Sequence, residues 1–224
     1  MTIRVLIADD EALMRQGLRM FVNSDPRTTT VGEATDGLQA VELCEELKPD
    51  VVLMDIQMPK MNGIEATAEI TKSQEESKVL ALTVFTSEPH VVSILQAGAS
   101  GFLVKDTTPE QLVQSIVDIH DGKAVLSAEI SSQLISAVRS QPHGNAAQRL
   151  EEANQHLDVD VTERELSILQ LLAKGMSNAE MAEALNLAEG TIKANFGRIM
   201  SKMEARDRVQ VLIRATKLGV ISLD

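Results

Sequence analysis

The stretch from Asp50 to Gly63, which reads DVVLMDIQMPKMNG, is the feature of this sequence that most constrains its fold. A run of apolar, partly β-branched residues leads directly into Asp55, and a loop rich in proline, asparagine and glycine follows. Short apolar runs between turn signals are typical of strands that are buried on both faces of a parallel sheet. Asp55 should therefore stand at the carboxyl end of a buried strand, where open α/β sheets bind their ligands.

A second acidic feature has the same layout, because the apolar run Ile3–Ala8 leads into Asp9 and Asp10. Two parallel strands that end in carboxylates at one edge of a sheet form an oxygen-rich pocket suited to a hard divalent cation. The alternative for either stretch alone is an aspartate that starts a turn or caps a helix. The two stretches together, with the residues described below, favour the pocket.

Strand and helix patterns alternate through the first half of the chain. The expected strands are Ile3–Ala8, Thr30–Gly32, Val51–Met54, Val79–Thr83 and Gly101–Val104. Apolar residues at helical spacing lie between them, and Thr108–Gln111 has the cap hydroxyl, early proline and reciprocal cap that open a helix. Five βα units of this size predict an α/β fold with a doubly wound five-stranded parallel sheet.

Residues 161–224 are predicted to form a small all-α domain of four helices. Capping boxes open the first two helices, and the third has one apolar face. The landmarks are Thr162–Glu165, Ser177–Glu180, the tight turn Asn186–Ala188, the helix Glu189–Met203, and a last helix from Asp207 to Leu218. A short helix, a tight turn and a longer helix with an apolar face predict a helix-turn-helix, whose second helix could enter a major groove.

Charge and composition divide the chain in the same places. Residues 1–125 contain 10 Lys or Arg and 20 Asp or Glu, residues 126–160 contain 2 and 5, and residues 161–224 contain 9 and 8. The middle segment is polar and acidic and is broken at residues 140–145, so we interpret 126–160 as a partly helical linker. The last segment is the only one that a polyanion does not repel. It has no basic patch, however, so DNA binding must rest on geometry as well as charge.

The expected setting is the cytoplasm. No apolar run approaches the roughly 20 residues that span a bilayer, so no membrane partner is expected. Cys44 is the single cysteine, which excludes an internal disulfide and fits a reducing compartment. It shares a helical stripe with apolar residues, so we expect it in the core. We expect Met14, Met20 and Met181 to fill the core as well.

These motifs resemble a known family. Roughly the first 122 residues resemble the receiver domain of two-component response regulators, which implies a flavodoxin-like fold, and residues 160–224 resemble the LuxR-type helix-turn-helix. Together they are similar to the NarL/FixJ class of response regulators. The matching motifs are the Asp9-Asp10 pair, Asp55-x-x-Met58-Pro59-x-x-Asn62-Gly63, Thr83 at a strand end, and the run Gly101–Lys105.

The resemblance implies that Asp55 is the phosphoryl acceptor, whose carboxylate forms an acyl phosphate. Mg²⁺ would offset the repulsion between this carboxylate and the incoming phosphate. Asp10, Asp55 and the backbone carbonyl of Gln57 would hold the ion. Asp9 would position bound water, and Lys105 would add a second positive charge opposite the metal. Lys105 could also simply form an ion pair with the acidic cluster, and before phosphorylation we expect it to do both.

The resemblance also implies a switch. Thr83 would hydrogen-bond a phosphoryl oxygen, and Phe102 would then rotate inward and remodel the face of the fourth and fifth helices. Two departures from the family affect this switch. Asp106 stands where many receivers have a proline with a cis peptide bond, and Phe102 lacks the hydroxyl group of tyrosine. In this family the lifetime of the acyl phosphate depends partly on nearby side chains, here Gln57 and Phe85.

In the second domain, the apolar stripe of Glu189–Met203 predicts which residues face away from the core. These are Lys193, Ala194, Gly197 and Ser201, flanked by Arg198 and Lys202. Lys193 is the candidate for a base-edge or phosphate contact. Arg198, Lys202 and Arg206 are expected to contact phosphates, which position a domain without reading sequence. A solvated helix face is the alternative. Glycine costs a helix interior about 0.5–1 kcal/mol relative to alanine and reads no base, so direct readout should be sparse.

The sequence therefore predicts a phosphorylation-dependent DNA-binding transcriptional regulator. A sensor histidine kinase would phosphorylate Asp55, and the resulting homodimer would bind half-sites in double-stranded DNA about one helical turn apart. Val209, Leu212 and Ile213 resemble the family's dimer contact but could equally be core. The chain would catalyse at most its own phosphorylation and dephosphorylation.

Two alternatives belong to other classes of function. A Mg²⁺-dependent phosphohydrolase with an aspartyl-phosphate intermediate needs an acid/base carboxylate two residues after its nucleophile, and Gln57 occupies that position. A phosphorylation-independent DNA-binding dimer would have no use for the intact acidic pair, Asp55, Thr83 and Lys105.

Overall fold

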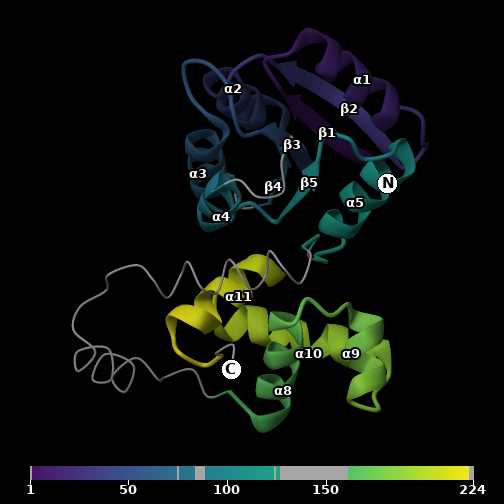
Figure 1. The fold of residues 1–224 in the computed structure, drawn as a ribbon, viewed down its shortest axis with the longest axis vertical. Coiled ribbons are helices and arrows are strands. Elements are labelled where there is room, and N and C mark those ends of the chain that lie inside the picture. Colours follow the sequence, from purple (N-terminus) through teal and green to yellow (C-terminus); the bar gives the residue numbers. More distant parts are fainter. Residues whose placement is uncertain (1, 75, 84–88, 124, 127–160, 222–224) are drawn as a thin grey trace, which may run out of the picture. The chain divides into compact units, whose positions relative to one another are not determined.

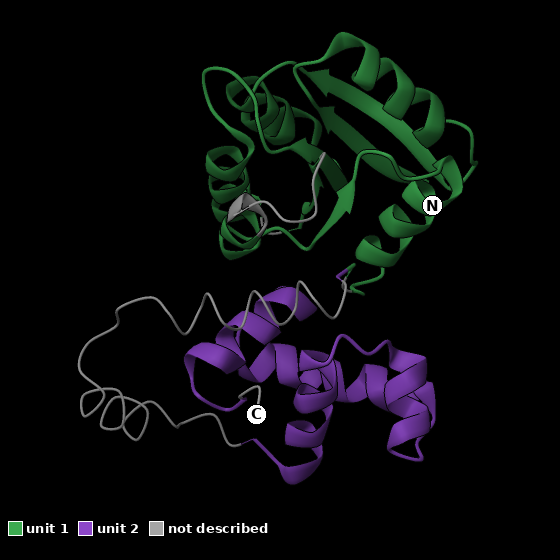
Figure 2. Ribbon diagram, viewed as in Figure 1, with its two compact units in different colours: residues 1–125 green, residues 126–224 purple. Residues whose placement is uncertain are grey.

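The computed structural model describes residues 2–74, 76–83, 89–123, 125–126 and 161–221. The chain divides into two compact units, residues 1–125 and 126–224, coloured green and purple in Figure 2. The predicted linker of residues 126–160 lies outside the described residues from residue 127 onward. No helix among the described residues is long and apolar enough to cross a membrane.

A five-stranded parallel sheet forms the centre of the first unit (Figure 1). Its strands are β1 (Ile3–Ala8), β2 (Thr28–Ala34), β3 (Val51–Asp55), β4 (Lys78–Thr83) and β5 (Gly101–Val104), in the order β2-β1-β3-β4-β5. The predicted fold class is therefore confirmed. Strand β2 is longer than its apolar pattern indicated, because its polar threonines pair with β1 at the edge of the sheet, where only its two end residues are buried.

Helices cover both faces of the sheet. They are α1 (Ala12–Val22), α2 (Gly37–Leu47), α3 (Gly63–Ser73), α4 (Pro89–Gln96) and α5 (Pro109–His120). Helices α1 and α5 lie on one face, and α2, α3 and α4 lie on the other (Figure 1). The core between the sheet and the first pair includes Val5, Ile7, Leu18, Val22, Leu53, Leu80, Leu82, Leu112 and Ile116. Burying an aliphatic side chain of this size contributes roughly 1.5–3 kcal/mol.

The expected core positions are mostly, but not all, buried. Cys44 and Met181 are fully buried, and Met14 is half-buried. The prediction for Met20 is wrong, because 65% of this residue is exposed. Leu13 lies on the same side of α1, seven residues earlier, and is 83% exposed. Helical spacing identified a face of α1, but only the packing partners decide which apolar residues reach the core.

The second unit is a small helical domain. Its helices are α8 (Glu163–Ala173), α9 (Asn178–Ala184), α10 (Glu189–Lys202) and α11 (Arg208–Lys217). Both predicted capping boxes are present: Thr162 with Glu165, and Ser177 with Glu180. Val209, Leu212 and Ile213 are between 0% and 3% exposed, so they are core residues of this domain rather than a surface free to contact a second copy.

Candidate functional site

Three carboxylates meet at the carboxyl edge of the sheet. Strands β1 and β3 are neighbours, and their register pairs Ala8 with Met54, so the next residues, Asp9 and Asp55, come to lie side by side. Asp10 follows in the β1–α1 loop. One oxygen from each carboxylate lies within 4.8 Å of the others. Asp9 and Asp55 are buried and Asp10 is exposed, so the cluster opens to solvent on the Asp10 side.

Lys105 connects two of these carboxylates. Its Nζ lies 2.8 Å from Asp9 Oδ2 and 2.9 Å from Asp55 Oδ1, and only 6% of its side chain is exposed. Burial alone would lower the pKa of Lys105, but hydrogen bonds to both carboxylates raise it above the ordinary value. Burial raises the pKa of Asp55, an effect that the Lys105 ammonium group opposes. The site thus holds a charged ammonium group against the carboxylate at the end of β3.

The loop after Asp55 is shaped by a glycine. Gly63 donates its backbone N–H to the carbonyl of Ile56 over 2.9 Å. A Cβ atom on Gly63 would lie 1.9 Å from the carbonyl oxygen of Asp55, so no other residue fits without moving the backbone. Asn62 caps α3 through a capping box with Glu65, which fixes where the loop ends.

An ion pair and a backbone hydrogen bond join the same loop to the start of α2. Lys60 has a left-handed backbone with φ +64°, and its Nζ lies 2.6 Å from Asp36 Oδ2. The backbone N–H of Gly37 donates to the carbonyl of Met61 over 3.1 Å. Hydrogen bonding by Lys60 lowers the pKa of Asp36, so this carboxylate stays charged.

A hollow of about 510 Å³ opens beside the acidic cluster. It is lined by Asp10, Ile56, Gln57, Met58, Asn62 and Ile64. Carboxylate oxygens that face an open, solvated hollow suit Mg²⁺, which binds few protein ligands and retains several waters. The donor set therefore fits the predicted cation, and Gln57 is among the residues that line the hollow.

The predicted switch residues Thr83 and Phe102 lie in β4 and in the neighbouring edge strand β5. Thr83 ends β4 and is 3% exposed, and its carbonyl accepts the backbone N–H of Lys105 over 2.7 Å. Phe102 is 7% exposed, so its ring is already buried in this structure. The predicted inward rotation therefore has no exposed starting position here. Phe85 lies outside the described residues. None of the described residues has a cis peptide bond, including those around Asp106.

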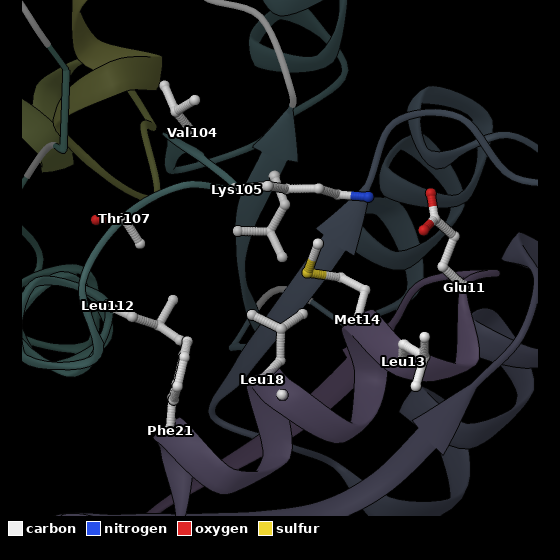
Figure 3. A pocket seen from close by; sticks show the side chains of 11 residues that line it. Glu11, Leu13, Met14, Leu18, Phe21, Val104, Lys105, Thr107 and Leu112 are labelled. Carbon is white, nitrogen blue, oxygen red and sulfur yellow. The ribbon is translucent and has the colours of Figure 1, made fainter.

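A second hollow, of about 350 Å³, lies between α1 and α5 (Figure 3). Apolar side chains of Met14, Leu18 and Phe21 from α1 and Leu112 from α5 line it. The stem of Lys105 crosses one end of this hollow (Figure 3). The sequence pattern did not predict this hollow, because it depends on how two helices distant in the sequence pack together.

The outward face of α10 agrees with the predicted pattern at all six positions. Lys193, Ala194, Gly197, Arg198, Ser201 and Lys202 are exposed, whereas Ile192, Phe196 and Ile199 are buried. Lys193 Nζ lies 3.3 Å from Glu189 Oε1, one helical turn away. No described residue lies within 4 Å of a Cβ atom built on Gly197. The face is therefore accessible and carries three cations and three small side chains.

Two of the cations predicted to contact phosphates form ion pairs within the domain. Lys202 Nζ lies 2.7 Å from Oε2 of Glu165, whose side chain is only 4% exposed. Burial tends to raise the pKa of Glu165, but hydrogen bonds from Lys202 and Thr162 lower it. Arg206 has a side chain that is 15% exposed, and its Nε lies 3.4 Å from Asp207 Oδ2. Lys202 is nevertheless exposed, whereas Arg206 is half-buried.

Sequence reasoning missed two arginines. The guanidinium carbon of Arg208 lies 4.1 Å from the ring centroid of Phe196, and burial lowers the pKa of this arginine to about 10. Arg15 on α1 donates hydrogen bonds to the carbonyl oxygens of Asp9 and Asp10. The position of Arg15 one turn into the helix after the acidic pair was the signal available for it. No comparable signal pointed to Arg208, whose contacts come from other helices.

Each of the two units matches a known protein family. Residues 5–117 match the response regulator receiver domain, and residues 160–215 match the bacterial regulatory proteins of the luxR family. The chain is 37% identical to the transcriptional regulatory protein LnrK of Bacillus subtilis over 97% of this chain and 98% of that protein. It is 33% identical to the nitrate/nitrite response regulator protein NarL of Escherichia coli over 93% of each chain.

A solved structure spans both units. The crystal structure of the response regulator ChrA, from a heme-sensing two-component system, is 31% identical in sequence to this chain. The match covers 98% of this chain and 99% of that one, with a TM-score of 0.51.

Proposed function

The chain belongs to the response regulators that join a receiver domain to a LuxR-type DNA-binding domain, and from that premise we propose that Asp55 is the residue that receives the phosphoryl group. Members of this family are DNA-binding regulators of transcription rather than enzymes in the ordinary sense. The observation that carries the assignment is the pair of contacts from Lys105 to Asp9 and Asp55 inside a three-carboxylate cluster.

In the proposed reaction, an oxygen of the Asp55 carboxylate attacks the phosphorus of a phosphohistidine on a sensor kinase. A P–O bond forms, the P–N bond breaks, and the imidazole leaves with the electron pair. Lys105 supports this step because its ammonium group already contacts an Asp55 oxygen at 2.9 Å and can offset charge on the incoming phosphoryl group. Any catalysis by the chain is limited to forming and hydrolysing this acyl phosphate.

The open side of the cluster is the proposed position for Mg²⁺. Asp10, Asp55 and the carbonyl of Gln57 would hold the ion, and Asp9 would orient its bound water. When bound, the ion supplies positive charge that neutralises phosphoryl oxygens. The buried position of Asp9, with Glu11 N–H donating to its Oδ1 over 2.9 Å, suits an orienting role.

The signal leaves the site through β4 and β5 in this proposal. Thr83 would hydrogen-bond a phosphoryl oxygen, and Phe102, on the strand that leads to Lys105, would respond by repacking. Because the ring of Phe102 is already buried, the proposed response is a change in its packing within the core rather than a rotation from solvent.

The outward face of α10 is the proposed DNA-reading surface. Lys193, Arg198 and Lys202 are exposed cations of this helix, and Ala194 and Gly197 allow the helix backbone to approach base edges closely. Two copies, joined on phosphorylation, would place this helix in successive major grooves, so half-sites should lie about one helical turn apart. Lys202 is exposed as well and stays a proposed phosphate contact, although it forms an ion pair with Glu165 as Lys193 does with Glu189. Arg206 is left out of the proposed direct contacts because only 15% of its side chain is exposed.

The proposed setting is the cytoplasm. The single cysteine, Cys44, is fully buried, and burial raises the pKa of its thiol, so the chain neither uses nor needs an oxidising environment. This setting is also where a kinase can draw on ATP for the phosphoryl group.

The test compares wild type with Asp55→Asn and with Asp50→Asn, which changes an aspartate at the opposite end of the same strand. Each protein is treated with acetyl phosphate and Mg²⁺, the modified residue is located by mass spectrometry, and DNA affinity is measured by footprinting. We expect modification and tighter binding for wild type and Asp50→Asn only. Equal tightening of all three proteins, or modification at another residue, would refute the assignment.

A further inference from the structure

We propose that Arg15 is a positioning residue that holds the Asp9–Asp10 pair in the geometry that binds the divalent cation. This role rests on the proposed metal-dependent function of the cluster. It adds to the cluster a group that touches neither the metal nor the phosphoryl group.

Arg15 contacts the backbone of both acidic residues. Its Nη1 donates to the carbonyl oxygen of Asp9 over 2.7 Å and to that of Asp10 over 3.1 Å. A single nitrogen thus bridges two consecutive peptide units. The planar guanidinium group suits this arrangement, because its several N–H donors have fixed directions. The contact sets the direction of the chain just where it leaves β1 and turns into α1.

Arg15 is itself fixed from a third side. Its Nε lies 3.6 Å from Oε2 of Glu33 on β2, and its side chain is 14% exposed. The backbone N–H of Asp9 donates to the carbonyl of Ala34 on the same strand over 3.1 Å. The acidic loop is therefore tied to the edge strand both through its own backbone and through Arg15. Because the Arg15 side chain is held at three points, holding the acidic loop costs it little further conformational entropy.

The two aspartates differ in how much other support they receive. Asp9 is buried, and its carboxylate forms an ion pair with Lys105 and accepts a hydrogen bond from the backbone N–H of Glu11. Asp10 is exposed, and Arg15 holds its carbonyl. Loss of Arg15 should therefore loosen Asp10, a proposed direct ligand, more than Asp9. Removing groups that hold metal ligands in place typically lowers metal affinity about 10- to 100-fold.

A charge effect and a positioning effect of Arg15 would change the Mg²⁺ affinity in opposite directions when the residue is removed. A cation near three carboxylates repels a divalent metal, so removing the charge of Arg15 should by itself tighten Mg²⁺ binding. If Arg15 acts by positioning, its removal should instead weaken binding. The sign of the change in affinity therefore separates the two explanations.

Arg19 provides a matched control. It lies one turn further along α1, and its Nη1 contacts the same Glu33 at 3.1 Å. Its side chain is 49% exposed. Arg19→Ala removes the same charge and a bond to the same partner, but it leaves the hydrogen bonds to the Asp9 and Asp10 carbonyls intact.

The experiment measures Mg²⁺ affinity by isothermal titration calorimetry, without a phosphodonor, for wild type, Arg15→Ala, Arg15→Lys and Arg19→Ala. Melting temperatures by circular dichroism verify that each variant is folded at the titration temperature. We expect Arg15→Ala to weaken Mg²⁺ binding about tenfold or more. Arg15→Lys keeps the charge but lacks the fork of donors, so it should weaken binding several-fold. Arg19→Ala should stay within twofold of wild type.

Equal or tighter Mg²⁺ binding by both Arg15 variants would overturn the proposal. Weakening by Arg19→Ala to the same extent as Arg15→Ala would also overturn it, because the effect would then come from Glu33 or from general charge. If Arg15→Ala does not fold, Arg15→Lys decides the question. Absence of Mg²⁺ binding in wild type would instead refute the proposed function of the cluster, so the two failures are distinguishable.

Discussion

Replacing Gly63 by alanine should damage both the stability of the first unit and its phosphoryl acceptance. The added Cβ would lie 1.9 Å from the carbonyl oxygen of Asp55, whereas real Cβ contacts essentially never fall below 3.0 Å. The two groups must therefore separate by about 1.1 Å. Neither can do so by a side-chain rotation, because the obstructing atoms belong to the backbone of β3, whose five residues are all buried.

The magnitude follows from two opposing effects. Forcing an extra carbon into a well-packed region costs about 1–3 kcal/mol or more, and the rigid backbone places this site in the upper part of the range. Alanine regains at most about 1 kcal/mol through its higher helix propensity at the start of α3. We therefore expect a net loss of about 2 kcal/mol in the free energy of unfolding. For a unit of this size that corresponds to a fall in melting temperature of about 8 °C.

Gly17→Ala is the matched control. Gly17 lies within α1 of the same unit, and nothing lies within 4 Å of a Cβ atom built there. This substitution should raise stability by about 0.5–1 kcal/mol. Differential scanning calorimetry and circular dichroism suit the comparison, because the chain contains no tryptophan or tyrosine for fluorescence. The rate of modification by acetyl phosphate should fall for Gly63→Ala, since Asp55 must move, and stay unchanged for Gly17→Ala. If Gly63→Ala melts at or above the wild-type temperature and reacts at the wild-type rate, the steric argument is refuted.

Two further predictions concern the second unit. Lys202→Met should destabilise the second unit by roughly 1–2 kcal/mol. This value is toward the low end for a hydrogen bond between charged groups, because the Lys202 side chain is 35% exposed and solvent screens its charge. Since the pKa of Glu165 is lowered in the folded state, its contribution is present above the ordinary value of 4.5 and lost as the pH falls through the folded-state pKa. The melting-temperature difference between wild type and Lys202→Met should accordingly be largest near neutral pH and shrink in acid, and a constant difference would contradict this account. Gly197→Leu should melt no lower than wild type, because the site is open and leucine favours helix. In a gel-shift assay, however, this variant should bind operator DNA less tightly than wild type. Unchanged affinity would show that this face of α10 does not enter the groove.

Features that depend on a few neighbouring residues were predictable from the sequence. The capping boxes at Thr108, Thr162 and Ser177 form as expected, because each joins residues three positions apart. Strand β5 begins and ends at the expected residues, and β3 extends the expected range by only one residue, to Asp55. The grouping of Asp9, Asp10 and Asp55 required one tertiary assumption, that β1 and β3 are parallel neighbours. The strand-helix alternation supports that assumption, which is why the cluster was predicted.

Apart from the acidic cluster and its ion pair with Lys105, contacts between residues far apart in the sequence were not predicted. The ion pair between Lys202 and Glu165, which lies 37 positions earlier and on another helix, was not predicted. Arg206 appeared to be a free surface cation, but its side chain is largely buried. Met20 appeared to be a core residue, but 65% of it is exposed.

The sequence alone thus determined the element types, the order of strand and helix, and the acidic chemistry at the strand ends, because local hydrogen bonding and hydrophobic period govern these features. Only the tertiary structure decided which cations are free, which apolar faces are covered, and that Arg15 reaches back to the Asp9 and Asp10 carbonyls. Hydrophobic periodicity predicts the direction in which a side chain points, but not its contact partner. That partner is set by the packing of elements which the sequence separates by tens of residues.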